Sequence, residues 1–307
     1  MSQDRALQRR ELAQNGYTLL KGALSPAFMA DYRKVLSETL YRKRKADENT
    51  VAGAEPDSLG RFPDTRILLE QQALFETVAD ILEFAPSYCH HSDIQINRTA
   101  SWHRDSINRG LYFDFCKTEI FDTNDYAVYK ICVYCQDHQG GGGLSVIPGT
   151  HLKDGPPDAA RGVPINSRLG DVILFDTRLY HKGIVSHRDR DSDSDRMACF
   201  MTLARDNPIT REFVNGTIWR QNQQLNREAY SLPTDLAELL TRVSLPPIPY
   251  GNSPQPSMRS VFSELEGARK RVKRLERENS RLKKYSGWLG PLHRAVATYW
   301  KAVGTNG

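Results

Sequence analysis

The sequence predicts a mainly β fold with flanking helices and a C-terminal coiled-coil helix. Short apolar runs alternate with Gly, Asn and Asp turns between residues 88 and 206, which is typical of a β-sandwich or barrel. Apolar residues at helical spacing precede this region, and a heptad repeat follows it near the C-terminus. The 307 residues suffice for one large or two small domains. The sequence contains no run of eighteen apolar residues that could span a membrane.

The N-terminal part is expected to be mostly helical. Residues 16–25 are expected to form a short strand, and the apolar residues of 26–42 recur at helical spacing. A second helical region is predicted over residues 67–84, closed by Ala85-Pro86, because a proline disfavours helix at the residue before it. The polar stretch 43–61 contains Gly and Pro and is expected to be a loop.

The central region is expected to hold the strands of the β domain. The expected strands are residues 92–97, 126–136, 144–147, 172–175 and 197–204, all apolar runs bounded by turn residues. The following residues are mixed in character, with one helix expected at 234–243, and they end in a proline-rich segment.

Two histidines and an aspartate form the central constellation. His103 and Asp105 are two residues apart, so on extended backbone both side chains leave from the same face. His181 follows an apolar, strand-like run. Two imidazoles and one carboxylate, with other coordination positions open, are what non-haem Fe(II) oxygenases use. An H-x-D tripeptide alone is common by chance and a histidine at a strand end is usually structural, so the combination favours a metal site.

Two basic residues are candidates for binding an anion. Arg196 opens an apolar strand fifteen residues after His181, and a guanidinium pairs with a carboxylate through two parallel hydrogen bonds. The alternative is a surface arginine that closes the acidic loop before it. Lys130 lies mid-strand among apolar residues. It either meets an anion, such as a cosubstrate or an acidic substrate, or is an edge-strand lysine whose amine reaches solvent.

Five segments occur in order along the chain: GYTLLKGALSPAFMADYRKVL, WHRD, GGGLSVIPGTH, GDVILFD and LYHKG. Together they resemble the phytanoyl-CoA hydroxylase (PhyH)-like family of Fe(II)/2-oxoglutarate-dependent dioxygenases, over about residues 13–204. The resemblance implies a double-stranded β-helix, a cupin-like jelly roll. It also implies that His103, Asp105 and His181 bind iron, that Arg196 binds 2-oxoglutarate, and that turnover consumes O₂ and yields succinate.

The sequence departs from this family at two positions. The family's arginine commonly lies closer to the second histidine than the fifteen residues found here, and Gly183 occupies a position where the family has a hydroxyl residue. Arg188 or Arg190 therefore competes with Arg196. Arg196 is preferred because it begins the apolar strand, whereas the other two lie in a polar loop.

A polar face is expected on the strand before WHRD. Asn97 matches a family asparagine near 2-oxoglutarate, so the resemblance makes it a further cosubstrate-binding candidate. Asp93, Gln95 and Asn97 alternate along the strand and therefore share one face, which is expected to line the cavity.

The net charge of +5 is unevenly distributed along the chain. Residues 257–307 carry a net charge of +8, and the preceding residues carry −3. This boundary indicates a body with an appendage. We therefore divide the chain into a dioxygenase domain (1–245), a proline-rich linker (246–257), a basic coiled-coil helix (258–285) and a short aromatic amphipathic tail (286–307).

The coiled-coil helix is expected to form a homodimer. Its core positions are spaced by four and three residues in alternation, and the charged pairs expected across a parallel dimer are opposite in sign. The core positions are Val261, Leu265, Ala268, Val272, Leu275, Asn279 and Leu282. The alternative is an amphipathic helix that packs on its own body.

The ends of the chain bear on location and partners. Residues 286–307 suit either a peripheral contact with an anionic membrane or, as we favour, packing against the dimer or a partner enzyme. The N-terminus lacks the apolar core of a signal peptide, so the sequence predicts a cytoplasmic protein. Five scattered cysteines argue against a disulfide framework.

The expected function is oxidation of a small metabolite, either a specialised metabolite or a sugar-type molecule. A non-catalytic jelly-roll scaffold that dimerises through the coiled coil is the alternative, and the complete set of His103, Asp105 and His181 argues against it. A nucleic-acid demethylase is disfavoured because the body is acidic and shows no basic patch with interleaved aromatics. No nucleic-acid partner is therefore expected.

Overall fold

The computed structural model of the protein describes residues 3–42, 53–106, 119–138, 142–184, 195–251, 272 and 274–276. The contacts divide the chain into two units, Met1–Ser253 and Pro254–Gly307, and nearly all described residues belong to the first. The predicted linker, residues 246–257, spans this division.

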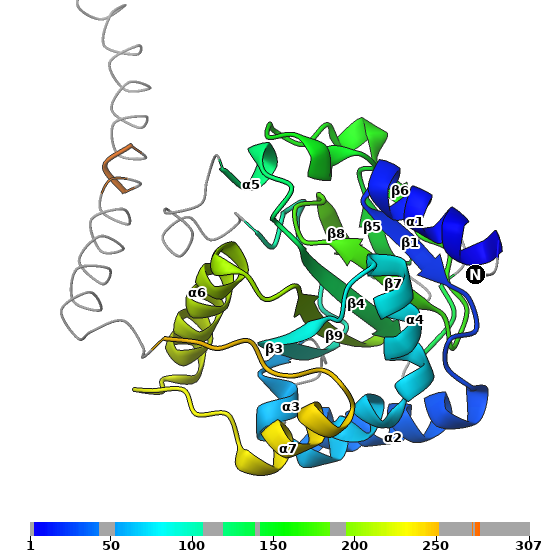
Figure 1. The fold of residues 1–307 in the computed structure, drawn as a ribbon, viewed down its shortest axis with the longest axis vertical. Helices are drawn as coiled ribbons and strands as arrows, with labels where there is room; N and C mark the ends of the chain where they lie inside the picture. Colours follow the sequence, from blue (N-terminus) through cyan, green and yellow to red (C-terminus); the bar gives the residue numbers. More distant parts are fainter. Residues whose placement is uncertain are drawn as a thin grey trace, which may run out of the picture. The chain divides into compact units, whose positions relative to one another are not determined.

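Two antiparallel sheets form the centre of the first unit (Figure 1). The larger sheet has six strands in the spatial order β1 (Tyr17–Leu20), β7 (Val172–Asp176), β4 (Val128–Tyr134), β9 (Met197–Ala204), β3 (Ser87–Ile96) and β2 (Gly53–Pro56). The smaller sheet has three strands in the order β6 (Val163–Pro164), β5 (Gly143–Val146) and β8 (His181–Ile184). Every ladder within both sheets is antiparallel.

The larger sheet is covered on both faces, as β4 illustrates. Ile131 and Val133 pack in the core beneath the helices, whereas Cys132 and Tyr134 belong to a second cluster with residues of β5, β7 and β9. This second cluster joins the two sheets face to face. Cys135, just after β4, packs in the first cluster, so the two thiols of the C-x-x-C segment lie on opposite faces and serve in core packing, as predicted.

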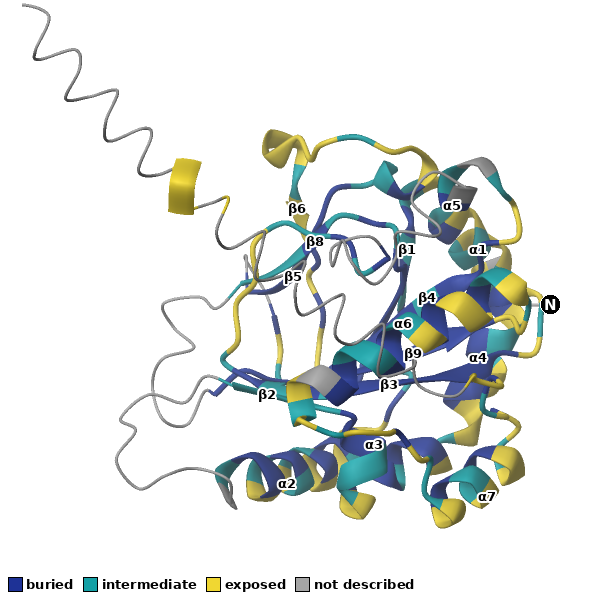
Figure 2. Cartoon of the chain, turned by 90° about the vertical axis from the view of Figure 1, so that its left-hand side faces the viewer, coloured by how far each residue is buried: buried dark blue, intermediate teal, exposed yellow. Residues whose placement is uncertain are grey.

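Helices cover the face of the larger sheet that is turned away from the smaller sheet. The described helices are α1 (Gln3–Asn15), α2 (Pro26–Arg42), α3 (Ser58–Arg61), α4 (Gln72–Leu82), α5 (Glu119–Asp122), α6 (Pro208–Leu225) and α7 (Thr234–Arg242), with 3₁₀ turns at Pro63–Glu70, Thr150–Leu152 and Ala159–Arg161. The core beneath them includes apolar residues of α2, α4 and α7. α6 packs on β3 and β2, the two strands at one edge of the larger sheet. Figure 2 shows buried strands beneath helices whose outer faces are exposed.

The predicted mainly β architecture with flanking helices is confirmed. Within it, β2 and α3 lie in the stretch 43–61 that was expected to be a loop, and the predicted helix 67–84 is divided by Gln71 into a 3₁₀ turn and α4. His181 begins β8 instead of ending the preceding strand. The predicted coiled coil lies outside the described residues except for 272 and 274–276, and the expected alternative arginines, Arg188 and Arg190, also lie outside them.

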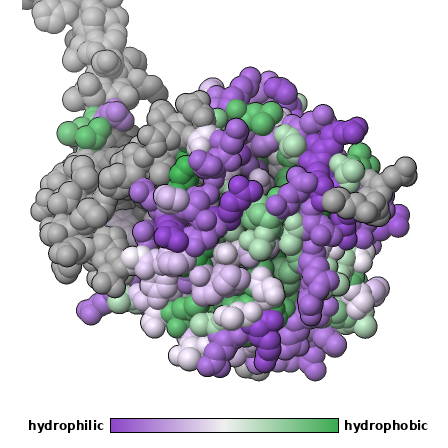
Figure 3. Space-filling model, in the orientation of Figure 1, coloured by the Kyte–Doolittle hydropathy of each residue, from purple (hydrophilic) through white to green (hydrophobic). Residues whose placement is uncertain are grey.

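The described surface seen in Figure 3 is mainly hydrophilic. In the view of Figure 3, hydrophobic residues form small patches between hydrophilic ones. Among the described helices, none is both long and apolar enough to cross a membrane.

Candidate metal centre

Main-chain hydrogen bonds bring His103 and Asp105 to the start of β8. The His103 N–H donates to the His181 carbonyl at 3.0 Å, and the His181 N–H donates to the His103 carbonyl at 2.9 Å. The Asp105 N–H donates to the carbonyl of Thr177 at 3.0 Å, in the turn between β7 and β8. The predicted residues therefore meet because a short segment after β3 pairs with the edge of the smaller sheet.

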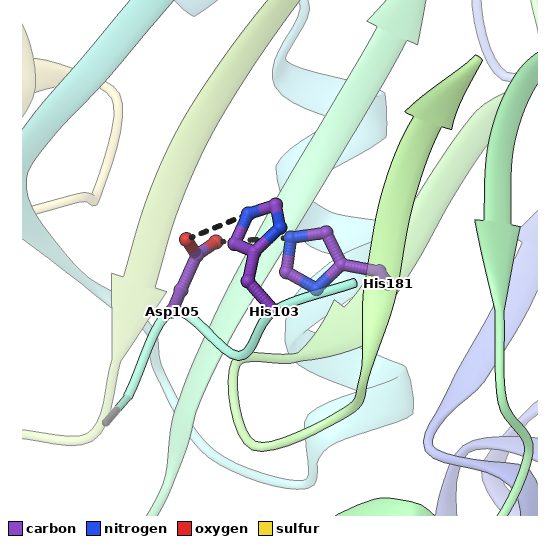
Figure 4. A group of neighbouring side chains, drawn as sticks. All are labelled: His103, Asp105 and His181. Atoms are coloured by element: carbon purple, nitrogen blue, oxygen red, sulfur yellow. Dashed lines mark ion pairs between the residues drawn. The ribbon is translucent and has the colours of Figure 1, made fainter. Parts of the chain in front are cut away.

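The three side chains converge on one point (Figure 4). One ligand atom from each residue lies within 4.8 Å of the others. The Asp105 carboxylate lies 3.7 Å from Nε2 of His103 and 3.5 Å from Nε2 of His181. Among the described residues, these three form the group of histidine, cysteine, aspartate or glutamate side chains that lie close enough together to hold a metal ion.

The backbone orients both imidazoles for metal binding. Nδ1 of His103 lies 2.8 Å from the Ser101 carbonyl, and Nδ1 of His181 lies 2.9 Å from the Leu179 carbonyl. A carbonyl only accepts hydrogen bonds, so each ring carries its proton on Nδ1 and directs the lone pair of Nε2 towards the centre. Such outer partners set the tautomer of metal-binding histidines.

The charges at the centre also suit a cation. Burial, together with neighbouring His181, lowers the pKa of His103 to about 4, so this ring is neutral at neutral pH. Burial alone would raise the pKa of the Asp105 carboxyl, but Lys130 and the two histidines hold it well below its usual range. A neutral imidazole and an ionised carboxylate are the protonation states that metal ligands require.

Lys130 is buried and has an anionic partner. Its Nζ lies 2.5 Å from Oδ2 of Asp105, and the residue is 5% exposed. β4 lies between β7 and β9 in the larger sheet, so the alternative of an edge-strand lysine is wrong. The lysine extends into the cavity beside the metal centre.

Arg196 lies at the start of β9 and also lines the cavity. Nη1 donates to the Arg98 carbonyl at 2.6 Å, and Nη2 donates to the Tyr134 hydroxyl at 2.9 Å. Its buried Nε has no hydrogen-bond partner, and no carboxylate of the described residues forms an ion pair with it. A Cβ at Gly183 would lie 2.9 Å from Nη2, so the glycine leaves room for the guanidinium.

Asn97 acts on Arg196 and does not line the cavity among the described residues. Its amide nitrogen donates to the Asp195 carboxylate, and its amide oxygen accepts from the Arg196 N–H at 2.8 Å. Asp93 and Gln95 do line the cavity, but the alternation stops at Asn97, where φ is +49° and β3 has ended. The expectation that all three residues share one cavity face is therefore wrong for Asn97.

The cavity has a volume of about 670 Å³ and is lined from both sheets and from α6. Sequence analysis did not identify the contribution of α6: Arg220, Gln224 and Leu225. Half of the buried face of α6 is polar, including Thr217 and Gln221, which weakens its hydrophobic periodicity. A signal for the helix was nevertheless present, since the Asn207 side chain caps the Thr210 N–H next to a proline at the first helical position.

Comparison with known proteins identifies one family profile and several similar folds. The profile described as Phytanoyl-CoA dioxygenase (PhyH) matches residues 12–192. No curated protein matches the sequence. Among solved structures, the α-ketoglutarate-dependent epimerase SnoN from nogalamycin biosynthesis is 14% identical, with a TM-score of 0.52 over 69% of this chain and 86% of SnoN. Another structure of SnoN contains Fe³⁺, α-ketoglutarate and nogalamycin RO.

Two further solved structures share the fold. AviO1 from Streptomyces viridochromogenes Tue57 is 19% identical, with a TM-score of 0.52 over 68% of this chain and 97% of AviO1. The α-ketoglutarate-dependent carbocyclase SnoK is 18% identical, with a TM-score of 0.50 over 67% of this chain and 85% of SnoK. At these identities the likeness shows the fold.

Proposed function

The chain belongs to the phytanoyl-CoA dioxygenase family, and from this premise we propose that it is an Fe(II)/2-oxoglutarate-dependent dioxygenase that oxidises a small metabolite. The observation that carries the proposal is the convergence of His103, Asp105 and His181 in a cavity that Arg196 also lines. The SnoN complex with iron and α-ketoglutarate supports the same pair of cofactors for this fold.

The residues at the centre fit a ferrous ion. Two imidazole nitrogens and one carboxylate oxygen are available within 4.8 Å of one another, and this donor set leaves coordination positions for a cosubstrate and O₂. When bound, iron and 2-oxoglutarate supply the activation of O₂, with oxidative decarboxylation of 2-oxoglutarate to succinate. The protein's share is to hold the reactants and to exclude water.

Arg196 is proposed to bind the far carboxylate of 2-oxoglutarate. Arg196 is 1% exposed and its guanidinium lacks a carboxylate partner among the described residues, so a bound anion would compensate this buried positive charge. Asn97 supports this role indirectly because it holds the Arg196 main chain. Lys130 keeps Asp105 ionised and is a second cation within the cavity for a cosubstrate carboxylate.

Hydroxylation is the simplest outcome of this chemistry, because Asp105 supplies the carboxylate ligand that related halogenases replace with a small residue. SnoN and SnoK are an epimerase and a carbocyclase, so the fold also supports other oxidations. The substrate is proposed to be a specialised metabolite or a sugar-type molecule. The competing proposal is a jelly-roll scaffold without catalysis.

Replacing Asp105 with Asn tests the proposal. The substitution keeps the shape of the side chain but removes its negative charge. The reference is Asp80→Asn, the same change on the exposed side of α4. Under anaerobic conditions, wild type and Asp80→Asn should give the visible charge-transfer absorption of an Fe(II)·2-oxoglutarate complex, and in air they should release succinate.

The Asp105→Asn protein should lose both signals, and its iron affinity should fall by more than the roughly 10–100-fold that loss of an outer hydrogen-bond partner costs. Equal signals from Asp105→Asn and wild type would refute the assigned ligand. A wild type that shows neither absorption nor succinate would instead favour the scaffold.

A further inference from the structure

Part of the cavity wall belongs to residues that the proposed cofactor chemistry leaves unused. β3 contributes His91, Asp93 and Gln95, and α6 contributes Arg220 and Gln224. These side chains share one cavity with the metal centre, so they are placed to contact whatever lies next to the iron.

Asp93 presents an unsatisfied carboxylate oxygen. Its Oδ1 is enclosed by the protein, whereas its Oδ2, 3.4 Å from Nε2 of His91, is the oxygen that a ligand in the cavity can reach, and neither oxygen accepts a hydrogen bond from the described residues. A carboxylate oxygen can only accept, and a buried acceptor without a donor is costly. A ligand group in the cavity that donates a hydrogen bond to this carboxylate would remove that cost.

His91 lies between Thr202 and this carboxylate. Nδ1 of His91 lies 2.8 Å from the Thr202 hydroxyl, and both residues are almost fully buried. Burial lowers the pKa of His91 to about 4, so its ring is neutral at neutral pH. When the Thr202 hydroxyl donates to Nδ1, the ring proton lies on Nε2, which is 3.4 Å from Oδ2 of Asp93 and makes no hydrogen bond with the described residues.

The charges around Asp93 discriminate between classes of donor. Lys130 and Arg220 are cations that line the same cavity. An incoming ammonium group would be attracted by Asp93 but repelled by both cations, and an anion would be attracted by the cations but repelled by Asp93. A neutral hydroxyl meets the need for a donor without either repulsion.

The remaining groups on the wall favour several hydroxyls. Gln95 and Gln224 each carry a donor and an acceptor. Each hydroxyl of a polyol also donates and accepts, so such a ligand can pair with all of them. A flat apolar molecule would cover these polar groups without replacing their hydrogen bonds to water, which is costly.

We propose that Asp93, oriented by His91, is the substrate-binding carboxylate of this cavity and that the substrate is a neutral polyhydroxylated molecule of the sugar class. One substrate hydroxyl donates to Oδ2 of Asp93. The inference rests on the proposed function, because it takes this cavity as the place where the substrate meets the iron.

The test uses full-length protein with Fe(II) and 2-oxoglutarate under anaerobic conditions and three sets of probes. These are neutral methyl glycosides with their singly deoxygenated analogues, aliphatic ammonium compounds, and flat apolar polycyclic molecules. Binding is measured by ligand-observed NMR, and compounds that bind are then assayed in air for stimulated succinate release. At least one neutral glycoside should bind and stimulate.

In Asp93→Asn the affinity for that glycoside should fall about 10–100-fold, as expected for a lost hydrogen bond to a charged group. The analogue that lacks the bonding hydroxyl should bind wild type and Asp93→Asn equally. His91→Gln should cause a smaller loss, because the carboxylate remains but is less well oriented. Asp80→Asn is the matched reference, and melting temperatures identify any variant that fails to fold.

The proposal is overturned if no neutral glycoside binds, if only ammonium or apolar probes stimulate, or if Asp93→Asn binds the glycoside as wild type does. These results differ from failure of the proposed function, which would show as a missing Fe(II)·2-oxoglutarate absorption in the wild-type protein before any probe is added.

Discussion

At the scale of single residues, the guanidinium of Arg196 is held in position by the protein itself. Its two terminal nitrogens donate to the Arg98 carbonyl and the Tyr134 hydroxyl, and the Tyr134 ring centroid lies 5.0 Å from its central carbon. Asn97 fixes the same residue through its main chain. A binding group ordered in advance loses less entropy when its ligand arrives.

We expect Arg196→Lys to raise the KM for 2-oxoglutarate by about 10–100-fold, because an ammonium keeps the charge but cannot form two parallel hydrogen bonds to a carboxylate. The measurement is the rate of succinate release as a function of 2-oxoglutarate concentration. The matched changes are Arg188→Lys and Arg190→Lys in the neighbouring polar segment. A larger rise in either of these than in Arg196→Lys would move the role to that arginine.

Two of the three residues of the metal centre could be predicted from sequence because their spacing is local. Two residues on extended backbone share a face, which made His103 and Asp105 a recognisable pair. The role of Asn97 could not be predicted in this way, because alternation fails where φ becomes positive. The lack of a hydrogen bond to Asp93 among the described residues depends on which side chains other elements bring near it, and no local pattern records this.

At the scale of elements, β3 contains an irregularity that separates two adjacent histidines. The pairing register with β9 shifts between Tyr88 and Ser92, and His90 has φ of +54°. His90 contacts the Ile248 carbonyl at 2.7 Å and the Tyr230 hydroxyl at 3.2 Å, whereas His91 lines the cavity. One bulge thus ties the strand to residues after α7 and also supplies a cavity residue.

The protein should lose stability as pH falls from about 6.5 to 4. Burial lowers the pKa of His90 from 6.5 to about 4, so the unfolded chain binds the proton more tightly than the folded one. The contribution is complete above pH 6.5 and is lost towards pH 4, at about 1.4 kcal/mol per pKa unit. Urea unfolding at a series of pH values measures this loss.

The comparison variant is His90→Gln, which keeps a side-chain donor but does not titrate. Over this pH range, the free energy of unfolding of His90→Gln should fall by up to roughly 3 kcal/mol less than that of wild type. Parallel profiles for the two proteins would show that His90 is not responsible.

Sequence patterns predicted elements well where burial is apolar and poorly where it is polar. α2 and β9 have the predicted bounds because their apolar residues follow one period throughout. α6 escaped detection because Thr, Gln and Asn occupy much of its buried face. Since α6 supplies part of the cavity wall, the missing helix also hid that part of the site.

At the scale of the whole molecule, the division at Ser253 separates the described domain from the basic appendage. Val272 and Leu275, which the heptad places at core positions, are 53% and 61% exposed in the single chain. A partner helix would cover apolar residues at heptad core positions. We propose that a second copy of residues 258–285 supplies it.

Deletion of residues 257–307 should convert a dimer into a monomer, because the predicted interface is removed while the described domain is kept. Light scattering of the full-length and shortened proteins measures the mass. Leu275→Lys in the full-length chain places a charge at one core position and should weaken the dimer without shortening the protein. An unchanged mass after the deletion would contradict the predicted coiled coil.

The close approach of Gly183 and Arg196 joins β8, which begins with the second histidine, to the residue that immediately precedes β9. Each strand is held by its own sheet, β8 by β5 and β9 by β4, so the connecting segment can change length without moving either partner. Counting residues between histidine and arginine is therefore a poor guide when distant relatives are aligned. A better guide to the alignment is to consider positions 183 and 196 together. Relatives with a bulkier residue at position 183 should have their arginine at another position.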